Sequence, residues 1–415
     1  MLKCSVYCMC LISFCVLSVT TEHMFVYDNT WKHGATTPAD SCPERCNCTE
    51  DMRANCRNRA FKWFLQGLSK QTLWLNFQNN RLSSLRRDSL ENLTNLQYLD
   101  LSKNKLTLID STAFAKLSNL TELKLNSNLF DDLPSFLFSP LRSLRTLHLS
   151  NNRFAYNREA FINLSSLIEL RMNDVRFDTF PVFHYRDRAL LPSLTDLELK
   201  GNFFRFIEPN MLKGLKSLKS LVLTRNQIQY VSPNTFSRTK IESLVLDRNH
   251  PLSNLNPDSF RSSFLRKLSL DLSGFTLMKG ISSIFQQITN LEVLNLANTA
   301  LKDRVEEIAF QNLTNVLILG LSNVNMGGKL PVAMLSNTTK LKWLYMSNTN
   351  IGASIDNRFF QNVTNSLKHL NMANNKLAVI NRTSLPTELW DRLKGLTFLV
   401  IRSSATVTSS RFVDG

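Results

Sequence analysis

Apolar residues follow one pattern over residues 93–120, and most of the chain repeats that pattern. The spacing L-x-x-L-x-L-x-x-N-x-L begins at Leu96 and predicts a short strand followed by a turn. Leu99 and Leu101 stand two apart, so both side chains point to one side of the strand, toward a core. The amide of Asn104 can donate and accept, so it can bond the backbones of neighbouring coils. One coil cannot bury its leucines alone, but a stack of coils can.

The pattern recurs along the chain in register. Its starts are Thr72, Leu96, Leu120, Leu144, Leu167, Leu194, Leu218, Ile241, Leu265, Leu291, Val316, Leu341, Leu367 and Leu396, the last repeat being incomplete. A period of roughly 20–29 residues is the signature of leucine-rich repeats. We therefore expect an α/β repeat solenoid of about 14 repeats over residues 67–406. This leucine-rich repeat horseshoe would have a parallel sheet on its concave face and 3-10 turns or short helices on its irregular convex side.

The asparagine column is incomplete. It holds at Asn80, Asn104, Asn128, Asn152, Asn202, Asn226, Asn249 and Asn375, and lapses at Val175, Ser273, Thr299, Val324, Thr349 and Ser404. Ser and Thr can make part of the same bonds, whereas Val cannot. In three lapsed repeats an Asn stands one residue earlier, at Asn298, Asn323 and Asn348. The sequence leaves open whether these residues take over the bonds.

The N-terminus predicts export. Residues 1–20 combine one Lys, an apolar run and small polar residues, which is typical of a signal peptide. An uncleaved anchor and lipidation of cysteines 4, 8, 10 and 15 are the alternatives. Residues 21–41 are mostly polar and read as a flexible lead-in. No later stretch reaches 18 apolar residues, so we expect no membrane span in this chain and a secreted or cell-surface location.

Four cysteines follow the leader within fifteen residues, at Cys42, Cys46, Cys48 and Cys56. In an exported chain, an even and clustered set predicts disulfides, with three possible pairings, and a four-thiolate zinc site is the rival. The spacing C-P-x-x-C-x-C-x7-C from Cys42 to Cys56 resembles the N-terminal cap of extracellular leucine-rich repeat proteins, and we expect the cap over residues 42–66. That resemblance implies the pairs Cys42–Cys48 and Cys46–Cys56. A cap is needed because the first coil would otherwise expose its leucines.

Glycosylation sequons are frequent. They occur at Asn47, Asn92, Asn119, Asn163, Asn312, Asn337, Asn362 and Asn381. Five of them fall in the turn just before a strand, so glycans there would shade one flank of the solenoid.

Binding residues are sought in the columns that face out of the concave sheet, positions 2, 3, 5, 7 and 8 of each repeat. Basic stretches and exposed-column apolar residues there give the candidate ligand-binding set Lys124, Arg145, His148, Arg171, Lys219, Val222, Arg225, Val245, Arg248, Trp343 and Tyr345. Arginines and aromatics are common binding anchors, although single apolar residues are also common on surfaces. The insertion at residues 181–193 adds a further loop.

Net charge is +16, yet these columns contain 13 basic and 10 acidic residues, so most of the excess lies elsewhere. This argues against a concave groove built to neutralise phosphate and leaves open a polyanion on basic lateral loops. No catalytic motif appears and the six histidines are scattered, so we expect no enzyme, no cofactor and no metal.

The cap, the leader, the 24-residue repeats with Phe114, Phe138 and Phe236 at position 19, and the sequons together resemble the ectodomain of Toll-like receptors. The resemblance covers residues 42 to about 406 and implies recognition of a microbial, endogenous or protein ligand, with possible homodimerisation. Residues 407–415 form a tail without a cysteine cap, which favours a truncated form or a fragment of a longer receptor. The alternative is a secreted matrix or adhesion protein that binds other proteins without signalling.

Overall fold

The computed structural model describes residues 42–186, 188–249, 252, 254–271, 276–277, 281–301, 309–352, 354–377 and 384–397. The expected leader, lead-in and C-terminal tail lie outside these residues, as do Asn381, Ser273 and Ser404.

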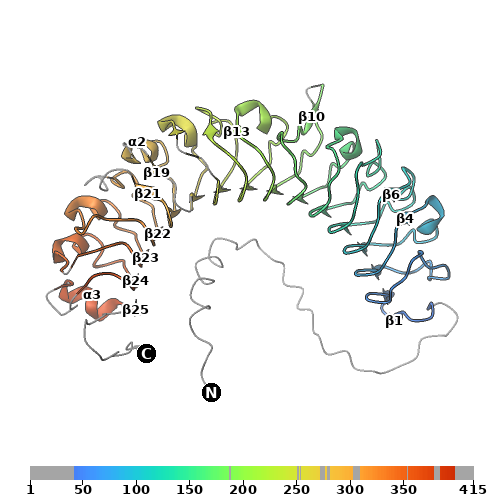
Figure 1. Cartoon of the computed structure of the whole chain (residues 1–415), viewed down its shortest axis with the longest axis horizontal. Coiled ribbons are helices and arrows are strands. Elements are labelled where there is room, and N and C mark those ends of the chain that lie inside the picture. The colour runs from blue at the N-terminus through green and yellow to red at the C-terminus, as the bar shows by residue number, and fades with distance from the viewer. Residues whose placement is uncertain are drawn as a thin grey trace, which may run out of the picture. The chain divides into compact units, whose positions relative to one another are not determined.

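Three-residue strands, one from each coil, build a single long sheet (Figure 1). In spatial order they are β1 (Asn47–Thr49), β2 (Arg53–Asn55), β3 (Trp74–Asn76), β5 (Tyr98–Asp100), β7 (Glu122–Lys124), β8 (Thr146–His148), β9 (Glu169–Arg171), β12 (Asp196–Glu198), β14 (Ser220–Val222), β16 (Ser243–Val245), β18 (Lys267–Ser269), β20 (Val293–Asn295), β22 (Ile318–Gly320), β23 (Trp343–Tyr345), β24 (His369–Asn371) and β25 (Gly395–Thr397). The pair β1–β2 is antiparallel and the sequential pairs from β2 onward are parallel, as the pairing of Leu99 with Leu123 shows. The expected leucine-rich repeat horseshoe is confirmed.

The outer side of the solenoid carries short pieces of secondary structure. The small sheets are β4 (Ser84–Leu85) with β6 (Leu108–Ile109), β13 (Phe206–Ile207) with β15 (Tyr230–Val231) and β17 (Asn254–Leu255), β19 (Thr276–Leu277) with β21 (Ala300–Leu301), and the hairpin β10 (His184–Tyr185) with β11 (Arg188–Ala189). The helices are η1 (Arg87–Ser89), η2 (Arg158–Phe161), η3 (Pro209–Leu212), η4 (Pro257–Phe260), η5 (Val332–Leu335), η6 (Asn357–Phe360), α2 (Ile281–Phe285) and α3 (Thr387–Arg392).

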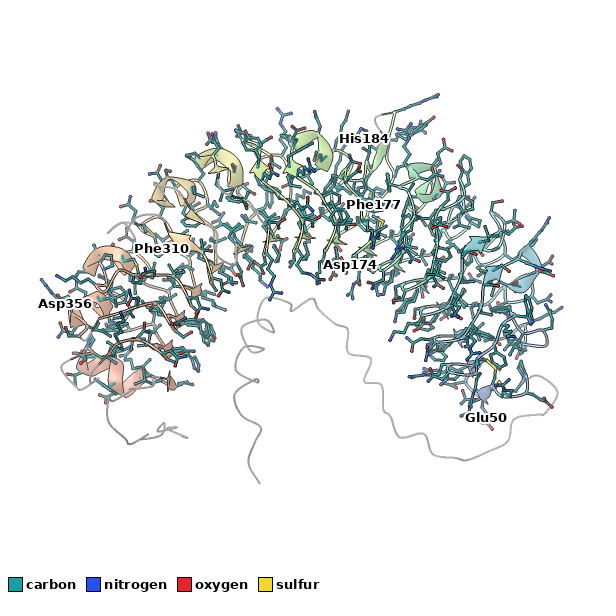
Figure 2. The ribbon with its side chains drawn as sticks, viewed as in Figure 1. Glu50, Asp174, Phe177, His184, Phe310 and Asp356 are labelled. Atoms are coloured by element: carbon teal, nitrogen blue, oxygen red, sulfur yellow. A yellow bond between two sulfur atoms is a disulfide. The ribbon has the colours of Figure 1, made fainter. Side chains whose placement is uncertain are left out.

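The core runs along the inside of the stack. The strand leucines, such as Leu99 and Leu123, have no exposed surface. Phenylalanines of successive coils pack on one another, with ring centroids 6.2 Å apart between Phe114 and Phe138 and 5.8 Å apart between Phe138 and Phe161. Figure 2 shows another such ring, Phe310, inside the coils. Each coil therefore completes the core of its neighbours, as a solenoid requires.

The asparagine column does what its chemistry predicts. Asn104 Nδ2 donates to the carbonyls of Phe77 and Leu101, both at 3.0 Å, and Asn104 Oδ1 accepts from Leu82 N at 3.1 Å. Its side chain thus joins two successive coils and satisfies buried backbone groups.

The lapsed repeats answer the question that the sequence left open. Thr299 Oγ1 donates to Leu270 O at 2.8 Å, so the threonine itself replaces part of the amide's bonding. Asn298, Asn323 and Asn348 are not in the core; each has a positive φ between 55° and 62° in the turn after its strand. Asn tolerates this left-handed backbone better than most residues, which gives these asparagines a separate role.

The expected start of the last repeat was wrong by three residues. Leu396 pairs with Leu370, the fourth position of its repeat, so Leu393 is the first position and not Leu396. A repeat that starts at Leu393 and one that starts at Leu396 both have apolar residues at positions 1, 4 and 6. These residues are Leu393, Leu396 and Phe398 in the first case and Leu396, Leu399 and Ile401 in the second. Sequence spacing alone could not separate the two registers.

The N-terminal cap closes the first coil. Disulfides join Cys42 to Cys48 and Cys46 to Cys56, the pairing implied by the resemblance, and they exclude the zinc alternative. The cap strand β2 pairs with β3 and extends the long sheet. Cys56 is fully buried, and the ring of Phe64 stacks on Phe77 at 4.9 Å. The cap therefore covers apolar surface that the first repeat would otherwise expose.

Candidate ligand-binding face

Positions 3 and 5 of each repeat project from the concave side of the long sheet. The structure places Lys124, His148, Arg171, Val222, Val245, Trp343 and Tyr345 there as half-buried strand residues, and Arg145, Lys219, Arg225 and Arg248 beside the strands as exposed residues. Whether this set binds a ligand stays a prediction. The parallel register brings its members side by side, as the pairing of Val222 with Val245 shows.

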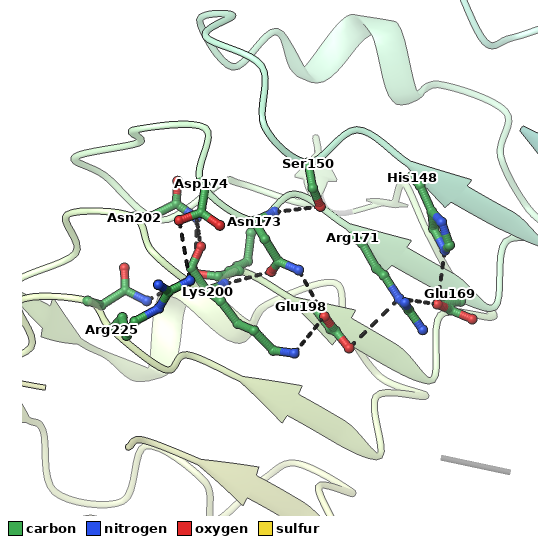
Figure 3. Close-up of polar contacts among 12 residues, drawn as sticks. His148, Ser150, Glu169, Arg171, Asn173, Asp174, Glu198, Lys200, Asn202 and Arg225 are labelled. Carbon is green, nitrogen blue, oxygen red and sulfur yellow. Dashed lines mark hydrogen bonds and ion pairs between the residues drawn. The ribbon is translucent and has the colours of Figure 1, made fainter. Parts of the chain in front are cut away.

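The first basic stretch consists of Lys124, Arg145, His148 and Arg171. Carboxylates lie among its side chains, as Figure 3 shows around His148 and Arg171. His148 Nε2 lies 3.1 Å from Glu169 Oε1, and Arg171 forms an ion pair with the same carboxylate. Glu198 lies between Arg171, at 3.7 Å, and Lys200, at 3.0 Å. This surface is therefore a charge network in which both signs alternate across β8, β9 and β12.

The glutamates of this network remain ionised. Burial alone would raise the pKa of Glu169, but the hydrogen bond with His148 and the charge of Arg171 hold the pKa below its ordinary value. Burial would also raise the pKa of Glu198, but the hydrogen bond from Asn173 and the charge of Lys200 hold that pKa below its ordinary value. An anionic ligand would have to compete with these carboxylates for the basic side chains.

Part of the second basic stretch, which consists of Lys219, Arg225, Arg248, Arg266 and Lys267, also forms ion pairs with carboxylates. Lys219 Nζ lies 3.2 Å from Glu242 Oε1, and Arg225 lies 3.6 Å from Asp174. Within this second stretch, Val222 and Val245 form a strip without charge on β14 and β16. The structure thus supplies a concave face of mixed charge with an apolar centre, which suits recognition of a protein or another ligand of mixed polarity.

A column of aromatic and cationic groups at the N-terminal end was missed from sequence. The rings of Trp74 and Tyr98 stack at 5.0 Å with planes 10° apart. Arg53 lies over Trp74 at 5.9 Å and Lys124 over Tyr98 at 5.1 Å. Burial raises the pKa of Tyr98, so its hydroxyl stays neutral. The available signal was that Trp74 and Tyr98 both occupy position 3, the column in which Trp343 was noticed.

A second missed feature lies on one flank. A cavity of about 680 Å³ is lined by Leu129, Arg153, Asp174 and Phe203, among other residues. The side chains of Leu129 and Phe203 are 52% and 41% exposed, so the cavity has apolar as well as charged groups in its lining. Both residues stand at position 10 of their repeats, a column that the sequence analysis did not consider.

The insertion at residues 181–193 forms the hairpin β10–β11, which projects from the outer side of the solenoid (Figure 1). Its Tyr185 ring lies between two guanidinium groups, 5.0 Å from Arg158 and 5.3 Å from Arg186. The hairpin is therefore a basic element remote from the concave sheet.

The sequons are spread over surface positions. Asn47, Asn92, Asn119, Asn163 and Asn337 are exposed, and Asn312 and Asn362 are half-buried. Asn119 and Asn337 already donate to the carbonyls of Thr94 and Gln311. Their use as glycan acceptors stays a prediction.

In the described part of the chain, no group of three His, Cys, Asp or Glu side chains is arranged to hold a metal ion. No helix among the described residues has the length and apolar character that a membrane crossing requires.

Comparisons with known proteins agree with the geometry. The leucine-rich repeat family model matches residues 71–130 and 192–250. A solved complex of Toll-like receptor 13 with single-stranded RNA is 25% identical, with a TM-score of 0.60 over 79% of this chain and 50% of that chain. The chain folds as a leucine-rich repeat solenoid with a disulfide-bonded N-terminal cap, and it is similar to Toll-like receptor ectodomains.

Other likenesses show the fold alone. Drosophila Toll, solved with Spätzle, is 21% identical with a TM-score of 0.59 over 79% of this chain and 43% of its own. An internalin (inlF) from Listeria monocytogenes is 19% identical with a TM-score of 0.57 over 79% of this chain and 88% of its own. The chain thus spans half or less of the two Toll-type chains that it matches. No curated protein matches the sequence.

Proposed function

We propose that this protein is the ligand-binding ectodomain, or a soluble form, of a Toll-like innate-immune receptor. The single observation that carries the proposal is the capped solenoid together with its similarity to Toll-like receptor 13 at 25% identity. The disulfides favour an extracellular location because they persist in oxidising compartments. The extended concave sheet offers a broad recognition surface rather than a closed catalytic pocket.

Within this proposal, the ligand contacts the concave face around β9 to β16. There the uncharged strip of Val222 and Val245 follows the charge network that reaches from His148 to Lys200, and it is accompanied by the ion pairs of Lys219 and Arg225. An apolar centre with a polar, charged rim is the usual anatomy of a protein-recognition surface. Basic lateral groups such as Arg158 and Arg186 would add affinity for polyanions, and the exposed flank at Phe203 is a candidate contact for a second copy.

A chimera tests the receptor assignment. Residues 1–415 are fused to the transmembrane and signalling segments of a Toll-like receptor, and a reporter gene is read in animal cells. The cells are given microbial RNA, protein and lipid fractions separately. We expect at least one fraction to activate the reporter, and nuclease, protease or lipase treatment of that fraction to abolish the response and identify the ligand class.

The alternative is a secreted adhesion protein that binds matrix proteins without signalling. It predicts a silent chimera at normal surface expression, together with saturable binding of the secreted chain to matrix proteins on a plate. That pair of results would contradict the receptor assignment while leaving the leucine-rich repeat fold intact.

A further inference from the structure

Over β20, β22, β23 and β24, charged side chains of the concave columns are confined to position 2, at Glu292, Lys342 and Lys368. No Asp, Glu, Lys or Arg stands at position 3, 5, 7 or 8 of these four repeats, a surface that we name the neutral patch. By contrast β7, β9 and β12 each carry charged residues at both positions 3 and 5. The histidine of the neutral patch is no exception, because burial and the charges of Lys394 and Lys368 lower the pKa of His369 and keep its ring neutral at pH 7.

Two aromatic rings form the centre of the neutral patch. Trp343 stacks on His369 at 5.7 Å with planes 4° apart. Tyr345 stands opposite Gly320 on the neighbouring strand, so no side chain covers its ring on that side. The space beside Gly320 is bounded on its other side by Asn295, because a Cβ added at Gly320 would come within 2.8 Å of Asn295 Oδ1. Burial raises the pKa of Tyr345, and its neutral hydroxyl can therefore donate and accept hydrogen bonds.

A ladder of amides borders these rings. Asn323 Nδ2 donates to Asn298 Oδ1 at 2.6 Å, and Asn348 Nδ2 donates to Asn323 Oδ1 at 2.7 Å. The ladder ends on a carboxylate, since Asn298 Nδ2 donates to Asp271 Oδ2 at 3.0 Å. A primary amide has two donor hydrogens and two acceptor lone pairs. A rung that uses one donor and one lone pair within the ladder therefore keeps a donor and an acceptor for another molecule.

The ligand must match an uncharged surface that offers ring faces and repeated amide donors and acceptors. We propose that the neutral patch binds an uncharged oligosaccharide, whose hydroxyls bond the amide ladder while an apolar sugar face packs on Tyr345 and Trp343. This inference rests on the proposed function, because it assigns a ligand class to part of the same concave face.

The size of the neutral patch supports a small ligand. Four strands at a spacing of about 4.8 Å, and a length of five residues at about 3.3 Å each, give roughly 300 Å². A stable interface between proteins buries about 800 Å² on each partner, so this area is too small for a second copy or a protein. Polyanions are disfavoured because no cation lies inside the neutral patch. Lys342 and Lys368 stand only at its edge, at position 2.

Titration of the secreted full-length chain with defined sugars tests the proposal. The probes are the hexasaccharides of maltose, cellulose, laminarin and mannan, with a heparin hexasaccharide and polyuridylate as charged controls, and calorimetry gives the Kd. We expect at least one neutral hexasaccharide to bind, and Tyr345→Ala to weaken that binding at least tenfold. Tyr230→Ala is the matched control, because Tyr230 is an exposed tyrosine on β15, outside the long sheet, and its loss should leave the Kd unchanged.

A second variant guards against misfolding of the first. Asn323→Gly removes the central amide of the ladder without straining a backbone whose φ is 62°, and it should weaken sugar binding severalfold. Binding of none of the neutral sugars, binding only of heparin or polyuridylate, or an unchanged Kd in both variants would overturn the inference.

The outcome is separable from that of the chimera. A chimera that responds to a microbial fraction while no neutral sugar binds would overturn only the sugar inference. Sugar binding that Tyr345→Ala abolishes, with a silent chimera, would support the inference and count against the receptor assignment.

Discussion

At the scale of single residues, buried polar groups decide which coils fit together. Asn249 has no exposed surface, and its Nδ2 donates to the carbonyls of Leu223 and Leu246 at 3.0 and 2.7 Å. The column was predictable from sequence because its spacing is regular. The sequence could not predict which of Thr299 and Asn298 makes the core hydrogen bond, because both are polar and adjacent. The structure shows that Thr299 makes it and that Asn298 lies in the turn with a positive φ.

Removing one rung of the asparagine column should be costly. Asn104→Ala would leave the buried Leu82 N without its bond, and a buried unpaired group costs about 1–3 kcal/mol. The carbonyls of Phe77 and Leu101 would each lose one of two side-chain bonds, because Asn80 and Asn128 also donate to them. We expect a clear fall in the urea midpoint, followed by circular dichroism. Lys105→Ala, on the exposed neighbour, is the control and should leave the midpoint within error. Equal midpoints for the two variants would contradict the assigned role.

A buried carboxyl should make stability depend on pH. Asp247 is 5% exposed, and burial raises its pKa to about 6. The hydrogen bonds from Ser269 Oγ and Asp271 N and the charge of Arg248 lower the pKa, but burial outweighs them. The folded state then holds this proton more tightly than the unfolded state, so ionisation destabilises the fold as pH rises from about 4 through 6.

Asp247→Asn removes that ionisation. We expect the variant to exceed the wild type in unfolding free energy at pH 7.5 by about 2 kcal/mol more than it does at pH 4.5. Urea titrations of both proteins at the two pH values measure the difference. A gap that is constant with pH would show that the carboxyl does not titrate in this range.

At the scale of elements, the coil and the cap follow different rules. Each strand needs only a period-two pair such as Leu99 and Leu101, so strands were readable from sequence. The terminal strand β25 was misplaced because its neighbourhood fits two frames, and only pairing with β24 selects one. The flank cavity with Leu129 and Phe203 and the stacked pair of Trp74 and Tyr98 were missed for a related reason. They arise between coils, where residues distant in sequence become neighbours.

The cap should be needed for secretion. Cys46→Ser would break the disulfide to the buried Cys56, and loss of a native disulfide typically costs 2–5 kcal/mol in small capped units. We expect immunoblots to show the variant retained in cells and depleted from the medium. Ser69→Ala, an alteration outside the cap disulfides, serves as the control. Normal secretion of Cys46→Ser would mean that the first coil is covered without this bond.

At the scale of the whole molecule, the concave sheet changes character along its length. It passes from stacked aromatics at β3 and β5, through paired charges at β8 to β12 and the apolar strip at β14 and β16, to the neutral patch at β20 to β24. The sequence predicted the columns but described the region around Arg171 as basic. It could not show that Glu169 and Glu198 are close enough to neutralise it.

The central claim, that the concave face binds the ligand, can be tested by placing one new glycan on each side of the solenoid. Val222→Asn creates the sequon Asn-Leu-Thr on concave strand β14, and Ser237→Asn creates Asn-Arg-Thr at an exposed residue outside the long sheet. Both changes are made in the signalling chimera, and a mobility shift confirms that each glycan is attached. We predict that Val222→Asn abolishes the response to the activating fraction and that Ser237→Asn preserves it. A preserved response with a concave glycan, or a loss only with Ser237→Asn, would contradict binding on the concave face.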